Sequence, residues 1–518
     1  MPTGESSWSD WLGAQRVECE VRRPASVSAV LAAVEDAVRT KRRIRAAGAG
    51  HSTSDVARPS KGAILLSLEH LALDGADDVP WRKGDLSSVE PRIRPGEQLV
   101  RVSAGQSILA LNRELSRKRL ALPNLGSYDG QSIYGAIATG THGTGIGFGP
   151  LADLVASIEM VGVEDAGGPV VRHWRIEPTS GITDRDRFYA SRDRGRMTLI
   201  QDDEVFRSVV VGLGCFGIVT ALTLKVVPSF RLRETCELVA WSQLKHSLVQ
   251  RARAAQWLDV TMLPERLDGE HWCQVTVRER RPSTPEHIPV TSLPPRDDAR
   301  ILEARTREGK DQTELIRCAL AAGPLGTRIA TMKLREIMRA DVDRSRTRPI
   351  ESESYVVLRT SVGDWVKATS AEIAVDVSRT VEAVDATIAH LDAMAARGFH
   401  HISPLGIRFS KASSHYLAMQ YGRDTCTIEA PIPLGNVNVH SIGHSDVADA
   451  APILLNAFER ALIDPKIGGR PHWGQRHTVS GGFLMRYPKA PIWLRQYARF
   501  NRFGVFENWF TSRMSLRR

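Results

Sequence analysis

The chain has 518 residues, of which 42% are hydrophobic and 25% are charged. At the usual size of about 100 to 150 residues per domain, this length predicts two large structural units or three to four smaller ones. The composition is close to that of average globular proteins, which excludes a disordered or collagen-like chain. The cysteines are scattered, without Cys-x-x-Cys or zinc-site spacing, so we expect neither disulfides nor a metal site.

The formal net charge of +10 lies mostly near the C-terminus. Residues 486–518 contain eight lysines or arginines and one acidic residue, so this segment carries +7. We therefore expect no nucleic-acid partner. Aromatic residues alternate with the basic ones, and we expect them to pack on the core; attachment to an anionic membrane surface is the alternative. The N-terminus lacks the basic start and apolar run of a signal peptide, which favours a cytoplasmic protein.

The first elements form two similar units. Valine and leucine recur at every third or fourth position of 27–38, which predicts a helix with one apolar face and Ser26 as its N-cap. A short strand is expected at 44–47, followed by the glycine-containing loop 48–52. A second strand is expected at 98–103, followed by a helix from Ile108 that ends before Pro123.

Residues 126–149 contain eight glycines among 24 residues, where the average composition predicts about two. Such a density favours a backbone that a ligand approaches closely, for example a loop whose N–H groups surround a phosphate. A flexible surface loop is the alternative. The apolar residues at 133–138 argue against it, so we favour cofactor binding.

The apolar run 208–227 is the segment most similar to a membrane span, but Lys225 and three glycines interrupt it. We interpret it as two buried strands joined by a turn. The same run contains Gly-x-Gly-x-x-Gly at 212–217. A dinucleotide fold needs a helix after these glycines, and the β-rich sequence that follows does not predict one.

Beyond Pro228 the pattern predicts a second domain of mixed helices and strands. Residues 278–310 are rich in proline and charge, which indicates a surface excursion. A helix is expected at 380–394. Strands are expected at 355–358, 371–377, 405–409 and 416–419.

Three motifs together carry a resemblance to a known family. The segments RAAGAGHS (45–52), QSIYGAIATGTHGTG (131–145) and GRPHWGQRH (469–477) resemble the aldonolactone oxidase and alditol oxidase family, a branch of the vanillyl-alcohol-oxidase-type flavoproteins. The resemblance implies an α+β fold with a bipartite FAD-binding domain and an α+β cap domain. It places the FAD-binding domain, with two subdomains, at 1–228, the cap at 229–468, and a segment returning to the flavin at 469–518.

The resemblance also implies the cofactor and the residues that hold it. His51 matches a histidine that binds FAD covalently, and since no cysteine lies between Asn124 and Thr141, we expect a single covalent bond. Residues 212–219 match a later FAD-binding strand. The implied cofactor-binding residues are Ala47, Gly48, Ala49, Gly50, His51, Ser52, Ser132, Gly135, Ala136, Thr139, Gly140, His142, Gly143, Gly217, Ile218, Val219, His472 and Asn508.

The departures from the family lie at the expected reaction centre. The family has a Glu-x-Arg pair facing the flavin; Arg408 is present, but Gly406 stands where the glutamate is expected. Likewise Gln475 replaces a lysine that often follows His-Trp-Gly. The implied catalytic residues are Arg408, Glu372, Gln475, His477 and Ser132. A structural ion pair is the alternative role for Arg408, and a solvent-facing position is the alternative for Glu372.

The function implied is FAD-dependent oxidation of a CH–OH group of a sugar lactone, polyol or related alcohol by hydride transfer to flavin N5. The partners expected are a small-molecule alcohol and molecular oxygen or another electron acceptor. Because Gly406 removes the usual carboxylate, two alternatives stay open. One is a biosynthetic tailoring oxidase with an altered substrate, and the other is a flavin-binding protein with little turnover.

Overall fold

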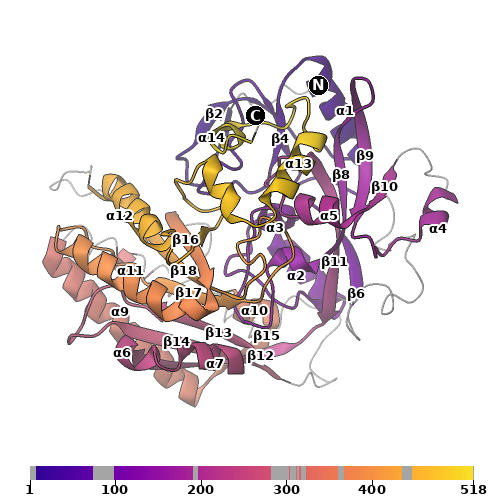
Figure 1. Cartoon of the computed structure of the whole chain (residues 1–518). Helices are drawn as coiled ribbons and strands as arrows, with labels where there is room; N and C mark the ends of the chain where they lie inside the picture. Colours follow the sequence, from indigo (N-terminus) through magenta and orange to yellow (C-terminus); the bar gives the residue numbers. More distant parts are fainter. Residues whose placement is uncertain are drawn as a thin grey trace.

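The structure is a computed structural model that describes residues 7–73, 98–190, 197–281, 303, 311, 314–316, 323–359, 367–433 and 446–516. Figure 1 shows two halves, each built around its own β-sheet system, with the C-terminal segment returning to the N-terminal half. No helix among the described residues has the length and apolar character needed to cross a membrane.

The N-terminal unit is a three-stranded parallel sheet with a helix packed beside it. Its strand order is β3 (Glu20–Arg22), β5 (Ile64–Ser67), β4 (Ile44–Ala47), and α1 spans Val27–Arg39. The Ser26 side chain accepts a hydrogen bond from the Ala29 amide, so the predicted N-cap is confirmed. A small ribbon, β1 (Ser7–Ser9) with β2 (Arg16–Glu18), precedes this sheet.

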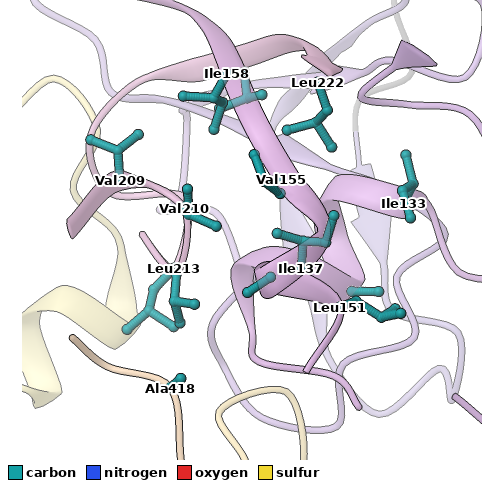
Figure 2. Packing of buried hydrophobic residues seen from close by; sticks show 14 of the residues in the cluster. Ile133, Ile137, Leu151, Val155, Ile158, Val209, Val210, Leu213, Leu222 and Ala418 are labelled. Carbon is teal, nitrogen blue, oxygen red and sulfur yellow. The ribbon is translucent and has the colours of Figure 1, made fainter. Parts of the chain in front are cut away.

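A six-stranded sheet forms the second unit of this half. Its order is β10 (Thr198–Gln201), β9 (Pro169–Glu177), β8 (Val155–Asp165), β11 (Ile218–Pro228) and β6 (Gln98–Ser103), with β7 (Leu120–Ala121) also paired to β11. The accompanying helices are α2 (Ile108–Arg117), α3 (Ile133–Ala138), η1 (Leu151–Leu154), α4 (Arg185–Ala190) and α5 (Asp203–Val209). Figure 2 shows Ile133 and Ile137 of α3 packed near β8, so the apolar part of the glycine-rich segment is anchored in the core.

The second half is an eight-stranded antiparallel sheet. Its order is β15 (Ile350–Glu353), β12 (Arg231–Ala240), β14 (Trp272–Arg281), β13 (Trp257–Met262), β17 (Leu405–Ser410), β18 (Thr425–Pro433), β16 (Ala368–Asp376) and β19 (Arg470–Pro471). The helices are α6 (Trp241–Leu244), α7 (Leu248–Ala254), α9 (Gly323–Thr347), α10 (Ser354–Leu358), η3 (Val377–Arg379), α11 (Thr380–Ala395) and α12 (Asp446–Leu462). Apolar side chains of α6, α7, α11 and α12 share one core with this sheet, and α11 and α12 lie side by side.

The C-terminal segment leaves this sheet through β19 and packs on the N-terminal half as η4 (Gly481–Arg486), α13 (Ala490–Phe500) and α14 (Trp509–Arg513). Trp493, Tyr497, Phe500, Phe506 and Phe510 are buried, so the prediction that the aromatic residues pack on the core is confirmed for these five. The basic residues form ion pairs with the same half, including Arg502 with Asp165 and Arg513 with Asp55.

Three predicted strands are wrong. Residues 355–358 are helical in α10, and residues 416–419 form buried turns. The first half of 208–227 is the end of α5 and a loop, so β11 is the one strand in this run. Because β11 begins at Ile218, it includes only the last two residues of the flavin-binding strand expected at 212–219. All three segments are short and buried on every side, and in that situation apolar periodicity does not separate a strand from a helix or a turn.

Two further predictions are confirmed, and a third lies mostly outside the described residues. The absence of a helix after Gly217 is confirmed, because β11 begins at Ile218. The helix expected at 380–394 is confirmed as α11. The surface excursion expected at 278–310 lies mostly outside the described residues. Cys318 also lies outside them, and the other five cysteines are free thiols.

Arg45 joins segments that are far apart in the sequence. Its guanidinium is 2% exposed and donates hydrogen bonds to the carbonyls of Gly214 (2.9 Å), Leu213 (2.9 Å) and Phe506 (3.3 Å), and also to the carbonyl of Val56. One side chain on β4 therefore holds the loop before β11 and the C-terminal segment against the N-terminal sheet.

We predict that Arg45→Ala lowers the free energy of unfolding by about 3 kcal/mol or more, because several buried carbonyls lose their donor at once. The measurement is the urea midpoint of the first unfolding transition. Arg39→Ala is the control: its side chain is 75% exposed and forms a surface pair with Asp36, so its loss should cost under about 1 kcal/mol. Equal midpoints for the two variants would contradict the role assigned to Arg45.

Candidate active site

A cavity of about 400 Å³ lies where loops of the N-terminal half meet the eight-stranded sheet. Its walls come from parts of the chain that are hundreds of residues apart. The lining segments fall within 45–57, 104–105, 126–142, 213–219, 368–372, 403–408, 429–433 and 472–475, together with Trp11, Leu68 and Ile316.

The two glycine-containing loops touch at one wall of this cavity. A Cβ atom on Gly48 would lie 1.9 Å from Ser132 Oγ, so the close approach of the loops requires glycine at this position. Beside this contact the His51 ring stacks on Tyr128 with centroids 4.3 Å apart, and Trp11 lies 4.7 Å away on a tilted plane. The imidazole is thus held in one orientation at the cavity wall.

Several polar atoms that face the cavity are suited to a polar ligand. Thr53 Oγ1, Gln131 Oε1, Thr141 Oγ1 and Gln475 Oε1 are buried, and none has a hydrogen-bond partner among the described residues. Buried polar groups without a partner are costly, so native structures normally satisfy them with protein, water or a ligand. Together with the glycine contact, this set fits a long ligand with many donors and acceptors, as FAD is.

At the other wall, three strands place their polar side chains in one row. Antiparallel register sets Gly406 of β17 opposite Glu429 of β18, and Glu429 opposite Glu372 of β16. Side chains alternate between the faces of a strand, so Ile407, Ile428 and Ile373 enter the helix-covered core. The intervening Arg408, Glu429 and Glu372 face the cavity.

Arg408 is paired with both carboxylates. Its Nη1 donates to Glu429 Oε2 at 2.6 Å and lies 3.5 Å from Glu372 Oε1. Burial by itself would lower the pKa of Arg408, but the charges of Glu429 and Glu372 raise it, so the guanidinium stays charged. The Gln475 amide donates to Glu429 Oε1 (3.0 Å) and Glu372 Oε2 (3.4 Å), which ties β16 to the 472–475 loop.

His142 and Glu372 form a buried pair behind this row. His142 Nε2 lies 3.2 Å from Glu372 Oε1, while Nδ1 lies 2.8 Å from the Gly143 carbonyl. Burial would lower the pKa of His142, yet the charge of Glu372 outweighs it and raises this pKa. Burial would raise the pKa of Glu372, but His142, His472 and Arg408 hold it well below its usual range. Each partner of the pair thus shifts the pKa of the other toward its charged form.

Most of the sequence-predicted residues meet in this cavity. Its lining includes Ala47, Gly48, Ala49, Gly50, His51, Ser52, Ser132, Gly135, Ala136, Thr139, His142, Gly217, Val219, Glu372, Arg408, His472 and Gln475. His472 is neutral, because burial lowers its pKa to about 4, and its Nδ1 accepts the Gly474 amide at 3.0 Å. The alternative of a solvent-facing Glu372 is wrong, because its side chain is 5% exposed.

Five predicted residues do not belong to the lining. Gly140 has φ +82° with open space around it, so glycine is favoured there by the backbone conformation. Gly143 is required by close packing, because a Cβ atom there would lie 2.1 Å from the Leu125 carbonyl oxygen. Ile218 faces away because it alternates with Gly217 and Val219. His477 packs edge-on against Trp473, where burial lowers its pKa to about 3.

Asn508, the fifth, acts in the supporting structure. It caps α14, and its Nδ2 donates to the carbonyls of Val56 (3.0 Å) and Arg58 (2.9 Å). It therefore holds the loop that follows the His51 segment.

The sequence analysis missed Glu429. The only local signal was an acidic residue within an otherwise apolar run, which is equally typical of a solvent-facing position. Its place opposite Gly406 depends on the pairing of β17 with β18, and strand register is not encoded by either strand alone.

Comparison with known proteins agrees with this geometry. Residues 20–172 match the family model described as an FAD binding domain, and residues 222–514 match that described as D-arabinono-1,4-lactone oxidase. An L-gulono-1,4-lactone dehydrogenase of Mycobacterium tuberculosis is 26% identical, with 98% of each chain covered. An alditol oxidase of a Streptomyces species is 25% identical over 95% of this chain and 94% of the relative.

A solved structure supports the fold. A cholesterol oxidase from B. sterolicum superposes with a TM-score of 0.68, at 14% identity, over 98% of this chain and 96% of that chain. The expected α+β architecture of a flavin-binding domain with a cap is thereby confirmed. The second family model covers more than half of the chain. The chain therefore belongs to the D-arabinono-1,4-lactone oxidase family and is a FAD-dependent oxidoreductase that acts on CH–OH groups.

Proposed function

We propose that this enzyme oxidises a CH–OH group of a neutral polyhydroxylated molecule, a sugar lactone or an alditol, in the cavity described above. One observation carries the proposal: a single cavity joins the His51 loop to the Arg408–Glu429 ion pair. The activities named for the two relatives, on L-gulono-1,4-lactone and on alditols, support the same substrate class.

The charges at the reaction end of the cavity favour a neutral substrate. Arg408 is already paired with both carboxylates, Glu372 and Glu429, and His142 lies 3.2 Å from Glu372, so the row offers no free cation to an anionic substrate. A neutral polyol enters such a site without burying an unpaired charge, whereas a carboxylic acid would bring one. The polar atoms of the row can then bind substrate hydroxyl groups.

We propose that FAD is held by residues 47–53 and by the part of 131–142 that lines the cavity, with His51 as the covalent attachment site. Bound FAD supplies the acceptor for hydride. The protein residues have other tasks: Arg408 stabilises negative charge that develops on the substrate oxygen, and Ser132 and Gln475 orient hydroxyl groups. Glu372 and His142 are positioning residues that hold Arg408 and Gln475 in place.

The domain limits 1–228, 229–468 and 469–518 are part of this proposal. The change from β11 to β12 at 228–231 separates the two sheets, which supports the first limit; β19 (Arg470–Pro471) still pairs with β16, and the C-terminal segment leaves the second sheet after it.

An altered substrate is a second candidate, and one observation favours it. Gly406 has no side chain, and Pro404, Pro431 and Pro433 add apolar surface nearby. A substrate panel of L-gulono-1,4-lactone, xylitol and cholesterol under anaerobic conditions decides between these classes by bleaching of the flavin absorbance. Hydrogen peroxide formed in air then shows whether oxygen serves as acceptor. No bleaching by the lactone or by xylitol would contradict the first proposal.

We predict that FAD stays attached when the protein is precipitated with acid, and that the band on a denaturing gel is fluorescent. His51→Ala should lose both properties, since it removes the imidazole proposed to carry the bond. His472→Ala, which changes another histidine of the same cavity, should keep the attached flavin. Complete release of flavin from the native protein into the acid supernatant would rule out the covalent bond.

A second prediction concerns Arg408. If its charge is used mainly in the transition state, Arg408→Ala should slow anaerobic flavin reduction by about 10²- to 10³-fold, while the apparent substrate dissociation constant changes much less. Stopped-flow absorbance at several substrate concentrations separates the two quantities. Lys411→Ala, an exposed cation just beyond the end of β17, should reduce flavin at the native rate. An unchanged rate in Arg408→Ala would remove this strand from the reaction centre.

A further inference from the structure

We propose that Glu429 is the carboxylate that faces the substrate and takes the hydroxyl proton during oxidation. This inference rests on the proposed function and names the base of the same site. Oxidation of an alcohol requires loss of the O–H proton as well as of hydride, and a positioned general base contributes typically 10²- to 10⁴-fold. The carboxylates that line the cavity are Glu372 and Glu429.

The side chains of these two glutamates differ in their exposed fraction. The Glu372 side chain is 5% exposed, and one of its oxygens lies 3.2 Å from the buried His142. The Glu429 side chain is 19% exposed and opens on the cavity. Glu372 lies near two basic groups, His142 (3.2 Å) and Arg408 (3.5 Å), and its pKa is held well below its usual range, so it is a poor proton acceptor.

The hydrogen bonds of Glu429 leave room for one more donor. Oε1 accepts from Gln475 Nε2 (3.0 Å) and from Ser370 Oγ (3.3 Å), while Oε2 accepts only from Arg408 among the described residues. A carboxylate oxygen has about two acceptor sites. Oε2 therefore keeps one site for a substrate hydroxyl, next to the guanidinium that would stabilise the developing alkoxide.

Gly406 makes this arrangement possible. A Cβ atom on Gly406 would lie 3.3 to 3.4 Å from the guanidinium of Arg408, closer than side chains ordinarily pack. The guanidinium thus occupies the space next to Gly406, where a side chain on β17 would begin. The carboxylate comes instead from β18, directly across the ladder. We infer that the glutamate missing from position 406 is replaced in space by Glu429.

The substrate O–H bond breaks and its proton goes to Glu429 Oε2. The C–H bond of the same carbon breaks with both electrons, which leave as hydride to the bound FAD, and a C=O bond forms. The substrate is oxidised by two electrons and FAD is reduced by two. Among the described residues, Arg408 and Glu372 lie beside Glu429, His142 lies against Glu372, Asp259 of β13 is opposite Arg408, and the nearby His472 is neutral.

The test begins with Glu429→Gln in the flavin-loaded protein. The amide oxygen still accepts from Arg408, so a purely positioning role predicts a rate within tenfold of native. A base role predicts anaerobic flavin reduction by L-gulono-1,4-lactone or xylitol slowed by 10²-fold or more, with a much smaller change in the apparent substrate dissociation constant. Glu279→Gln is the matched control, an exposed glutamate on β14 of the same sheet. A native rate in Glu429→Gln overturns the proposal.

A second variant gives a readout that needs no turnover. Glu429→Ala opens a space beside Arg408, and added formate should bind there. We expect formate to raise the melting temperature of Glu429→Ala and to shift its oxidised flavin absorbance, with neither effect in the native protein, and to restore part of the reduction rate. Absence of formate binding overturns the placement of Glu429. If neither lactone nor xylitol reduces the native flavin, the proposed function fails, and formate binding still decides whether Glu429 faces the cavity.

Discussion

The assembly of the cavity depends on one buried cation. Arg45 extends from β4 into the core and donates to backbone carbonyls of the Val56 loop, the loop before β11 and the C-terminal segment at Phe506. A guanidinium has five N–H donors in a rigid plane, so a single side chain can hold several loop segments at once. Two of these segments line the cavity.

The alternation of side chains gives the eight-stranded sheet one face that packs against helices and one face with charged side chains toward the cavity. Residues such as Ile373, Ile407 and Ile428 bury apolar surface against helices, and their neighbours on each strand present charge to the cavity. The strands that carry Arg408, Glu429 and Glu372 are each paired on both sides, so backbone hydrogen bonds fix the positions from which these side chains project. Precise placement of charge is what electrostatic catalysis requires.

The C-terminal segment links the two halves. It begins as the edge strand β19, passes His472 and Gln475 through the cavity wall, and ends with aromatic residues buried in the N-terminal half. Trp473, between His472 and Gln475 in the sequence, is fully buried, and its indole N–H donates to the Leu417 carbonyl at 2.7 Å. The cap and the flavin-binding half are therefore connected through the wall of the site itself.

The sequence by itself determined the local features. Ser26 caps α1, the strand at 44–47 leads into the His51 loop, and the apolar residues Ile133 and Ile137 of the glycine-rich segment are buried; each has a signal within a few residues, in capping or in apolar pattern.

What only the tertiary structure decided is non-local. Glu429 stands opposite Gly406 because of strand register, and His477 leaves the cavity because the chain turns at Trp473 toward a pocket of aromatic rings. Residues 355–358 are helical and not extended, since a short apolar run that is buried on all sides is compatible with either a helix or a strand. In each case the deciding partner lies far away in the chain, and local propensity carries no information about it.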